Sequence, residues 1–295
     1  MDISVVIPTH RRKERALETL RYFSGQTHKD FEIIIVDQGP KFITGEDLSR
    51  FDLKFTLKHV CLDEPNLGKA RNSGIENSRG DIILFCDDDI VPDKSLLEKH
   101  LENYKDDNVG GVGGRVISSG ERKDRRSIKQ LFPVVGSFNP IDASPICNFH
   151  IDKHCEVKHI KGCNMSFRKE LVIKAGLFDE SMAGTANLED ADMSFRIRKL
   201  GYKLLFEPDA KVEHLELKHG GCQMDDFRDL IYWLYFTDTL FYMRYFKKIF
   251  LPFFVSRIFA RMVYYIIVKS DFVIAICAKK GFLDAIKKYS EEKKV

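Results

Sequence analysis

The sequence predicts an α/β fold: a single mixed, mostly parallel sheet flanked by helices, with a helical extension at the C-terminal end. Short apolar runs that are typical of buried strands alternate with helical patterns over roughly the first 90 residues. These runs lack polar alternation, which indicates strands that are covered on both faces. Roughly the last 70 residues instead combine basic and aromatic side chains. The chain therefore divides into a sheet-containing part and a helical part.

The elements of the first half follow one another in order. Residues 3–9 form a β-branched run that is closed by Pro8, and Ala16, Leu20 and Phe23 recur at helical spacing. Glycines flank a further short helical pattern before the next apolar run. Strands are therefore expected at 3–9, 31–39, 55–62 and 81–89, and helices are expected at 11–26 and 66–80.

The second half is less regular. Gly201 ends a helical pattern that begins near residue 187, and glycines interrupt the apolar run at 109–120. The charged stretch 121–130 indicates a surface loop. The expected elements are a helix at 93–105, a Gly-rich strand at 109–120, a strand or loop followed by a helix at 159–180, a helix at 187–204, and a strand, a turn and a short strand at 202–216.

Composition argues against some classes of protein. The formal net charge of the 295 residues is +3, which is too small to indicate nucleic-acid binding. The seven cysteines are scattered and odd in number, which indicates reduced thiols in a cytosolic protein. The chain starts directly in a predicted strand, so a cleaved signal peptide is not expected. We expect no nucleic acid among its partners.

Three consecutive carboxylates stand at the end of a predicted strand. Asp87, Asp88 and Asp89 follow the apolar residues 83–86 and repel one another unless a cation lies among them. Mg²⁺ and Mn²⁺ take oxygen ligands and commonly bridge phosphates. In open parallel sheets, ligands bind beyond the carboxyl ends of the strands. The cluster therefore suits a divalent metal, and a solvated acidic turn or a helix cap is the alternative.

Other side chains near the same sheet edge suit a nucleotide. Lys69 and Arg71 lie in a glycine-containing loop and suit phosphate oxygens. Asp37, at the end of another predicted strand, can accept a hydrogen bond from a base. Each residue alone also fits a solvated loop or turn. Together with a metal they imply a nucleoside diphosphate. The sequence has neither a P-loop signature nor GxGxxG after its first strand, which disfavours a P-loop protein and a dinucleotide-binding fold.

Five ordered motifs resemble the inverting family 2 glycosyltransferases of the GT-A fold, over about residues 3–215. They are an opening strand and turn, an acidic strand end, a loop that leads to a DxD motif, a G-x-N-x-x-x-R segment, and an E-D segment with a trailing His. The corresponding stretches are VVIPTHRR (5–12), IIIVDQG (33–39), NLGKARNSGIENSRGDIILFCDDDIVPD (66–93), IKGCNMSFRKELVIKAGLFDE (160–180) and LEDADMSFRIRKLGYKLLFEPDAKVEH (188–214).

The resemblance implies a role for individual residues. The nucleotide sugar would be bound by Pro8, Thr9, Arg11, Asp37, Lys69, Arg71, Asp87 and Asp88. The metal, Mn²⁺ or Mg²⁺, would be bound by Asp89, Asp87 and His214. The acceptor side would be formed by Gly162, Cys163, Asn164 and Arg168. Asp190 would be the catalytic base, and Glu189 would either take that role or orient the acceptor. Gln38 stands where many members have a second Asp, which leaves the base preference open.

The chemistry of inverting transfer is consistent with these roles. A base must deprotonate the acceptor hydroxyl as it attacks the anomeric carbon. The leaving diphosphate needs positive charge, which a metal supplies. One acidic site for the metal and a second for the proton are therefore required. The cluster 87–89 and the pair Glu189 and Asp190 supply the two sites.

The expected function is metal-dependent hexosyl transfer from a nucleoside diphosphate sugar, with a UDP-sugar favoured, to a hydroxyl of a glycan or of a polyprenyl-linked acceptor in polysaccharide biosynthesis. A catalytic domain is expected at 1–220, with a nucleotide-sugar half (1–115) and an acceptor half (116–220). Residues 118–130 and Gly184 are expected to form a lid. A sugar-nucleotide-binding scaffold and a sugar-phosphate nucleotidyltransferase are the alternatives.

The C-terminal segment, 221–295, has an unusual charge pattern. Residues 239–270 contain six basic, ten aromatic and no acidic residues, and their longest uncharged run, 249–256, is short for a membrane span. Helices lying in a membrane interface fit this pattern, with unpaired cations facing anionic headgroups. A helical cap on the core or a dimer face is the alternative. Membrane contact through 239–280 would make the enzyme cytoplasmic and peripheral at the inner face of the cell membrane.

Overall fold

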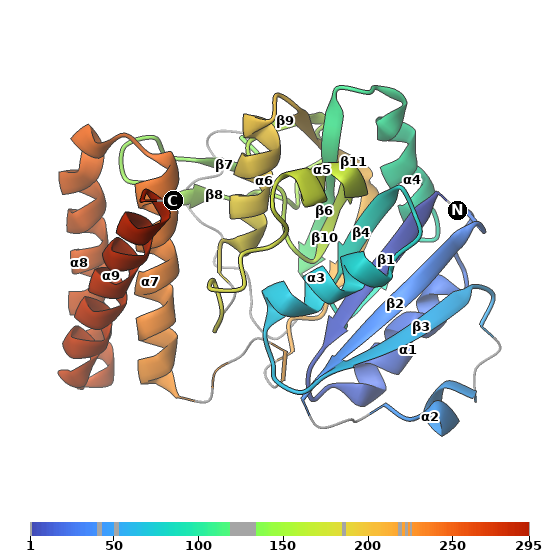
Figure 1. Ribbon diagram of the computed structural model, residues 1–295, viewed down its shortest axis with the longest axis horizontal. Coiled ribbons are helices and arrows are strands. Elements are labelled where there is room, and N and C mark those ends of the chain that lie inside the picture. The colour runs from blue at the N-terminus through green and yellow to red at the C-terminus, as the bar shows by residue number, and fades with distance from the viewer. Residues whose placement is uncertain are drawn as a thin grey trace.

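The computed structural model describes residues 2–39, 43–49, 53–118, 134–184, 187–217, 220–221, 224 and 226–294. Its main feature is a nine-stranded sheet in the order β3-β2-β1-β4-β10-β6-β11-β5, with β9 pairing to β11 (Figure 1). The strands are β1 (Ile3–Thr9), β2 (Phe31–Gln38), β3 (Thr56–Leu62), β4 (Ile82–Cys86), β5 (Ile90–Pro92), β6 (Val109–Ser118), β9 (Cys155–Val157), β10 (Asn164–Arg168) and β11 (Lys203–His214). A separate two-stranded sheet joins β7 (Ser137–Phe138) and β8 (Pro145–Ile146).

The direction of the strands confirms the predicted mixed and mostly parallel sheet. The strands β1, β2, β3 and β4 pair in parallel, and so do β6 and β11. Because β10 is antiparallel to both β4 and β6, these two groups point the same way. The carboxyl ends of β1, β4 and β11 therefore meet at one edge of the sheet. The four strands expected in the first half are all present.

One predicted strand boundary is wrong. Residues 202–216 were expected to contain a strand, a turn and a short strand, but β11 is a single strand of twelve residues. It pairs with β6 on both sides of a register shift between Glu207 and Lys211. Pro208 lies inside this irregularity, where its missing N–H group breaks no ladder bond. The strand thus continues past the proline and carries His214 to the edge.

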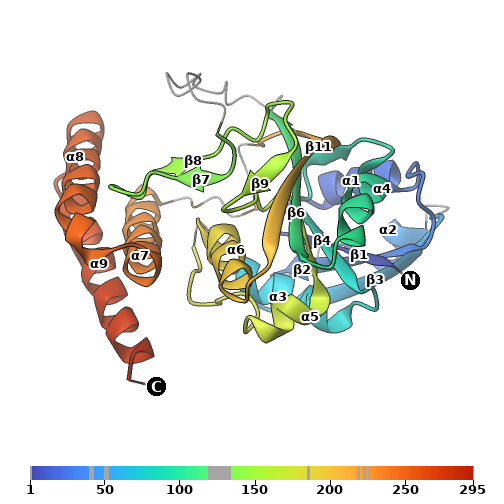
Figure 2. The same ribbon diagram turned by 90° about the horizontal axis from the view of Figure 1, so that it is seen from above.

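Helices cover both faces of the sheet. They are α1 (Lys13–Phe23), α2 (Gly45–Ser49), α3 (Leu67–Asn77), α4 (Leu96–Glu102), α5 (Lys169–Lys174) and α6 (Glu189–Lys199). Figure 2 shows α1 and α4 on one side of the sheet and α3, α5 and α6 on the other. The central strands β1 and β2 are buried along their whole length, as their continuous apolar runs predicted. Gly74 lets α3 approach β1, because a Cβ atom there would lie 2.3 Å from Val6 Cγ1.

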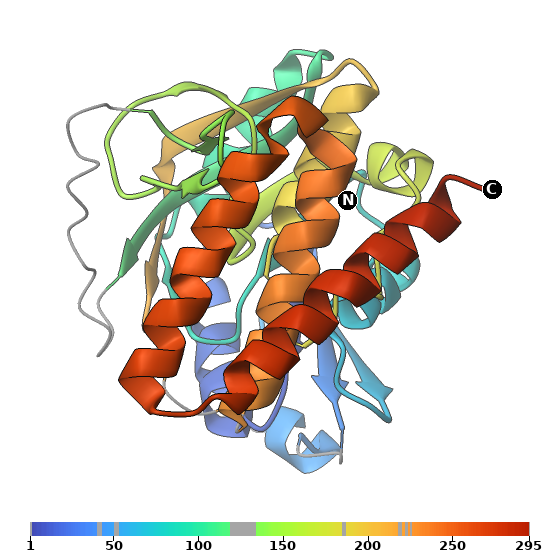
Figure 3. The same ribbon diagram turned by 90° about the vertical axis from the view of Figure 1, so that its left-hand side faces the viewer.

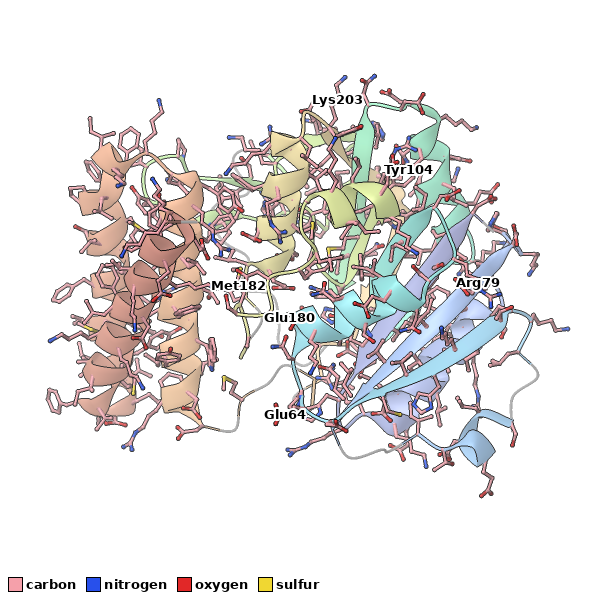
Figure 4. All side chains as sticks on the ribbon, in the orientation of Figure 1. Glu64, Arg79, Tyr104, Glu180, Met182 and Lys203 are labelled. Carbon is pink, nitrogen blue, oxygen red and sulfur yellow. The ribbon has the colours of Figure 1, made fainter. Side chains whose placement is uncertain are left out.

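Three long helices, α7 (Phe227–Tyr245), α8 (Leu251–Lys269) and α9 (Val273–Glu292), follow the sheet-containing part. Figure 3 shows α8 and α9 on the outer side of the molecule. The helix α7 packs on α6 through an aromatic cluster in which Phe195 and Phe241 have ring centroids 5.2 Å apart. Met182, labelled in Figure 4, is buried between the sheet-containing part and α7. The predicted boundary at residue 220 precedes α7 and stays a prediction.

Ion pairs attach α7 to the sheet-containing part. The guanidinium of Arg244 lies 2.6 Å from Asp179 and 3.0 Å from Asp192 on α6, and it also pairs with Glu292 at the end of α9. Arg257 and Arg261 of α8 lie 3.5 Å and 2.9 Å from the buried Asp238 of α7. The prediction of unpaired cations is therefore wrong for these three arginines, because their partners lie elsewhere in the sequence.

The ion pairs of Arg257 and Arg261 with Asp238 bear on how apolar the outer face of α8 is. By length and composition, Lys248–Lys269 is apolar enough to be a candidate membrane span, and only 11% of its most apolar window is buried. Arg257 and Arg261 interrupt the uncharged runs of this helix. The length of the longest uncharged run therefore did not indicate a candidate span. Both arginines face Asp238 on α7, so the outer face of α8 is left apolar.

Candidate active site

A cleft of about 550 Å³ opens at the carboxyl ends of β1, β4 and β11. It is where the sheet topology places ligands in open α/β folds. Its lining contains five groups that carry or can carry positive charge and six carboxylates. They are His10, Arg12, Arg71, Lys161 and His214, and Asp87, Asp88, Asp89, Glu189, Asp190 and Glu216. The cleft is therefore polar and highly charged.

The first group in the cleft is the run of three aspartates, whose positive partner is the residue just before α1. The Arg12 guanidinium, just before α1, lies 3.1 Å from Asp88 and 3.0 Å from Asp89. The hydroxyl of Thr9 donates a 2.6 Å hydrogen bond to Asp88. Burial raises the pKa of Asp88 to about 7, although Arg12 and Thr9 act in the opposite direction. The repulsion inside the cluster is thus offset by an arginine.

The second group could bind a metal ion. Ligand atoms of Asp87, Asp89 and His214 all lie within 4.8 Å of one another. The Nε2 atom of His214 is 3.0 Å from Asp89 and 3.5 Å from Asp87. Burial opposes the charged form of His214, but its hydrogen bond to Asp89 and the two negative charges outweigh burial, so its pKa is raised. Two carboxylates and one imidazole form a suitable donor set for Mn²⁺ or Mg²⁺.

The third group is a pair of carboxylates at the start of α6. Glu189 is buried and pairs with the buried Arg71 at 2.5 Å. Asp190 is less buried, and its Oδ2 atom accepts a 2.8 Å hydrogen bond from the backbone N–H of Gly162. Burial and the neighbouring Asp190 raise the pKa of Glu189, against the effect of Arg71. The backbone at Gly162 approaches Arg71 closely, since a Cβ atom there would lie 2.8 Å from Arg71 Nη2.

Most of the predicted site residues lie together in this cleft. Those that line it are Pro8, Arg71, Asp87, Asp88, Asp89, Gly162, Cys163, Glu189, Asp190 and His214. Thr9 lies directly behind Asp88, to which it is hydrogen-bonded. Six sequence-distant segments therefore contribute to one site, as the predicted sheet topology requires.

The predicted nucleotide contacts are brought together only in part. Arg11 and Lys69 are exposed and do not line the cleft. Arg11 has a positive φ of 58°, and the chain turns there so that Arg12 enters the site instead. Asp37 is buried behind the cleft, where it accepts a 3.1 Å hydrogen bond from the backbone N–H of Ile43.

Two of the predicted acceptor residues have structural surroundings. Asn164 is fully buried and accepts a 2.8 Å hydrogen bond from His100 Nε2. Arg168 donates to the backbone carbonyls of Val109 and Tyr104 at 2.9 Å. Because β10 runs antiparallel to its neighbours, Arg168 at its end lies at the sheet edge opposite the cleft. The structure thus corrects the placement of Asn164 and Arg168 next to an acceptor.

Sequence reasoning missed four titratable residues that line the cleft: His10, Arg12, Lys161 and Glu216. The tandem of Arg11 and Arg12 gave no sign of which side chain points inward. Lys161 precedes the glycine of a motif that was already singled out, so its position was the available signal. Residues 119–130 of the predicted lid lie outside the described residues. Its other member, Gly184, packs against Trp233 of α7.

Comparison with known sequences gives a consistent picture. The family described as Glycosyl transferase family 2 matches residues 4–175. The uncharacterized glycosyltransferase YfnE of Bacillus subtilis is 26% identical over 269 residues, which cover 77% of this chain and 68% of that protein. The probable glycosyltransferase YdaM of the same organism is 29% identical over 218 residues, which cover 70% of this chain and 49% of that protein. The chain thus spans only about half the length of YdaM.

Solved structures share the fold. Residues 1–349 of S. aureus TarS superimpose with a TM-score of 0.65 at 17% identity, over 97% of this chain and 81% of that one. The mannosyltransferase PcManGT of Pyrobaculum calidifontis gives a TM-score of 0.60 at 16% identity, over 99% of this chain and 87% of that one. The expected GT-A fold with C-terminal helices is confirmed by these similarities.

Proposed function

Because the chain belongs to glycosyl transferase family 2, we propose that it moves one sugar from a nucleoside diphosphate sugar to an acceptor hydroxyl, with inversion at the anomeric carbon. One observation carries this proposal. A single cleft contains the cation ligands Asp87, Asp89 and His214 and a separate carboxylate, Asp190, that is attached only to backbone N–H groups among the described residues. Inverting transfer requires both an acidic metal site and a base.

The donor set fits a divalent metal. Arg12 binds the Oδ2 atom of Asp89, while the Oδ1 atom of Asp89 and the Oδ2 atom of Asp87 face His214. Mn²⁺ or Mg²⁺ bound there would supply positive charge to the diphosphate of the donor. The ring nitrogen Nδ1 of His214 is buried and has no hydrogen-bond partner in the described part of the chain. A metal at Nε2 would compete with protonation of this histidine.

The two carboxylates of α6 have different tasks. Glu189 forms an ion pair with Arg71 through its Oε1 atom, and the guanidinium of Arg71 stays positively charged. Asp190 keeps an oxygen next to the Gly162 N–H and is open to the cleft, so it suits the base that takes the proton of the acceptor hydroxyl. The Gly162 N–H fixes the orientation of that carboxylate. This division of roles favours Asp190 over Glu189.

The donor is proposed to be a UDP-sugar, with a GDP-sugar as the competing choice. A structure of TarS contains UDP-GlcNAc, and the structure of PcManGT contains GDP-Man and Mn²⁺. Both share only the fold with this chain, so they define the panel of compounds to be tested. Pro8, His10 and Gln38 line the end of the cleft near β1 and β2, and we expect the base of the nucleotide to bind there.

The deciding experiment is a panel of UDP-, GDP- and dTDP-sugars, each tested with Mn²⁺, Mg²⁺ or EDTA. We expect one donor to raise the melting temperature in the presence of metal and to release nucleoside diphosphate when an acceptor is added. Asp89→Asn should lose the metal-dependent part of the shift. Asp209→Asn, which changes an exposed carboxylate outside the cleft, should keep it. Failure of every donor with every metal would contradict the proposal.

We further propose that α8 contacts a membrane. In the described residues, 17 large hydrophobic side chains are exposed, and twelve of them lie between Ile249 and Leu283. Lys247 and Lys248 precede the helix and Lys269 ends it, and all three are exposed, as expected for headgroup contact. Because α8 lies along α7 and is attached to it through Asp238, a position in the interface plane suits it better than a crossing.

Membrane contact is consistent with a lipid-linked acceptor. A sugar acceptor on a polyprenyl carrier would be presented at the membrane surface, next to a cleft that α7 borders through Leu230. The six described cysteines form no disulfide, which fits the reducing cytoplasm. We therefore propose that the enzyme works at the inner face of the cell membrane and contributes to polysaccharide assembly.

A further inference from the structure

One positively charged group in the cleft, Lys161, has no partner among the described residues. Arg12 pairs with Asp88, Arg71 with Glu189 and His214 with Asp89, while His10 is hydrogen-bonded to the backbone. The ammonium group of Lys161 makes no hydrogen bond or ion pair with any residue that the structure describes, although Lys161 lines the cleft and is partly buried. A partly buried lysine without a partner is costly in a folded protein unless it serves a ligand.

The surroundings of Lys161 keep its charge in place. Burial acts to lower its pKa, but nearby acidic groups, among them Glu216 and Asp87, outweigh burial, and the pKa is raised. These acidic side chains lie beyond ion-pair distance. The backbone of Lys161 is fixed as well, because its carbonyl accepts a 3.0 Å hydrogen bond from the N–H of Asn164. Lys161 thus presents a fixed positive charge to the cleft.

The position of Lys161 relates the metal ligands to the catalytic base. The next residue, Gly162, donates to Asp190 and accepts from Arg71. On the other side, Lys161 is close enough to Asp87 to interact with it electrostatically. Because Lys161, Asp87 and Asp190 line the same cleft, a group bound between the two carboxylates faces the part of the cleft that Lys161 lines. In the proposed reaction, that region contains the bond between the anomeric carbon and the diphosphate.

We infer that Lys161 binds the terminal phosphate of the donor nucleoside diphosphate, the phosphate from which the sugar departs. This inference rests on the proposed function and adds a residue to it. The acceptor oxygen forms a bond to the anomeric carbon while the bond between that carbon and the phosphate oxygen breaks. The electron pair of the broken bond stays on the phosphate oxygen, and the proton of the acceptor hydroxyl passes to Asp190. The charge that develops on the leaving oxygen is stabilised by the Lys161 ammonium.

A phosphate is a better ligand for Lys161 than a neutral sugar hydroxyl. The lysine is a compact point charge with three donors and gains most from a full negative charge. Arg12, Arg71 and His214 are already paired with carboxylates, so they add little net charge for a dianionic group. Lys161 is the group whose charge becomes paired only when the donor binds.

The test compares nucleoside diphosphates with nucleoside monophosphates. Binding of UDP, UMP, GDP and GMP is measured by titration calorimetry at saturating Mn²⁺, for the unmodified chain, Lys161→Met and Lys161→Arg. We expect Lys161→Met to weaken diphosphate binding by about tenfold to a hundredfold and to leave monophosphate binding within about twofold. Lys161→Arg, which keeps the charge, should restore most of the preference for the diphosphate.

A matched control is Lys158→Met, which removes the same charge from an exposed position three residues earlier, outside the cleft. It should leave both affinities unchanged. The melting temperature of Lys161→Met without nucleotide should stay near that of the unmodified chain, because no described partner is lost. An equal loss of diphosphate and monophosphate binding, or no loss of either, would overturn the inference while leaving the proposed function intact. If the unmodified chain binds no nucleotide, the proposed function and this inference fail together.

Discussion

At the scale of single residues, each carboxylate of the cleft is defined by its partner. Asp88 is bound by Thr9 and Arg12, and Asp89 is bound by Arg12 and His214. Glu189 is bound by Arg71, whereas Asp190 contacts only backbone N–H groups among the described residues. A carboxylate that already pairs with an arginine is a poor base. The partners therefore distinguish Glu189, which has a structural role, from Asp190, which is available as a base.

The first prediction concerns Asp190. Asp190→Asn should lower turnover by about 10²- to 10⁴-fold, the usual contribution of a general base. Nucleoside diphosphate affinity should stay unchanged, since Asn can still accept the hydrogen bond from Gly162. Single-turnover product formation and titration calorimetry measure the two effects. Asp209→Asn is the control for an exposed carboxylate. Retention of nearly full turnover by Asp190→Asn would rule out its role as the base.

The second prediction concerns the buried pair of Arg71 and Glu189. Glu189→Gln should destabilise the fold by about 3–5 kcal/mol, because it leaves the charge of Arg71 buried and uncompensated. The double variant Arg71→Met with Glu189→Gln should recover part of that loss. Urea unfolding of the two single variants and the double variant gives the interaction free energy.

A control for this cycle is the pair Arg15 and Glu18, in which both side chains are 41% exposed. Glu18→Gln should change the free energy of unfolding by less than about 1 kcal/mol. If Glu189→Gln proved equally mild, the pair would not be a buried ion pair at the pH of the measurement.

At the scale of elements, a buried polar network joins α4 to the sheet below the cleft. The hydroxyl of Ser166 on β10 lies 2.8 Å from both Tyr104 and His100 Nδ1. His100 Nε2 donates to Asn164, whose amide donates to the carbonyl of Ala210. His100 is neutral in this arrangement, because burial lowers its pKa to about 4. The network therefore fixes α4, β10 and β11 relative to one another as long as His100 is uncharged.

The third prediction is a loss of stability in acid. The unfolded chain binds a proton at His100 below about pH 6.5, and the folded chain binds it only near pH 4. The unfolded state therefore binds more protons in this window, and stability falls as the pH decreases from about 6.5 to 4. At pH 4, proton binding to His100 in the unfolded chain lowers the free energy of unfolding by on the order of 3 kcal/mol. His159, whose pKa burial also lowers to about 4, adds in the same direction.

Urea unfolding between pH 4 and pH 7.5 measures this effect. His100→Gln should be less stable at neutral pH, and its stability should depend less steeply on pH than that of the unmodified chain. His154→Gln, which removes a half-exposed histidine, should leave the dependence unchanged. An identical slope for His100→Gln and the unmodified chain would mean that His100 is not kept neutral by burial.

At the scale of the whole molecule, the C-terminal helices connect the cleft to an apolar outer surface. Arg244 of α7 contacts Asp192 on α6, the helix that begins with the two cleft carboxylates. Gly281 lets α9 cross α7 closely, since a Cβ atom there would lie 2.2 Å from the carbonyl of Tyr232. Because Arg257 and Arg261 of α8 pair with Asp238 of α7, these contacts connect α8 through α7 to the helix that begins with the cleft carboxylates.

The fourth prediction concerns that outer face. Replacing Phe253, Phe259 and Ile267 together by Ser should abolish sedimentation with lipid vesicles made of neutral and anionic phospholipids. Their side chains are 57%, 58% and 71% exposed, so the folded state should lose little stability. The control variant replaces Ile117, Ile141 and Ile173, which are similarly exposed but lie outside the helical segment, by Ser. A dimer in solution that the first variant dissociates, without any vesicle binding, would favour a dimer face instead.

Some elements of this protein follow from local sequence alone. The apolar runs at β1, β2 and β4 are long enough and bounded clearly enough to predict buried strands, and their polar ends predict where the cleft lies. The order of five motifs was sufficient to indicate the family. The path of β11 was not predictable locally, because Pro208 reads as a turn until the pairing with β6 is known.

Which side chains share the cleft was decided by tertiary structure. The motifs that resemble family 2 glycosyltransferases supplied the set Asp87, Asp89, Asp190 and His214. Sequence alone selected Arg11, whereas Arg12 lines the cleft, because the positive φ of Arg11 turns the chain at that point. It placed Arg168 near an acceptor, whereas the reversed direction of β10 carries it to the far edge. It treated Arg257 and Arg261 as unpaired, although Asp238 on a neighbouring helix forms ion pairs with both. Local pattern fixes the period and chemistry of each segment, while ion pairing and strand direction depend on partners that only the folded chain brings together.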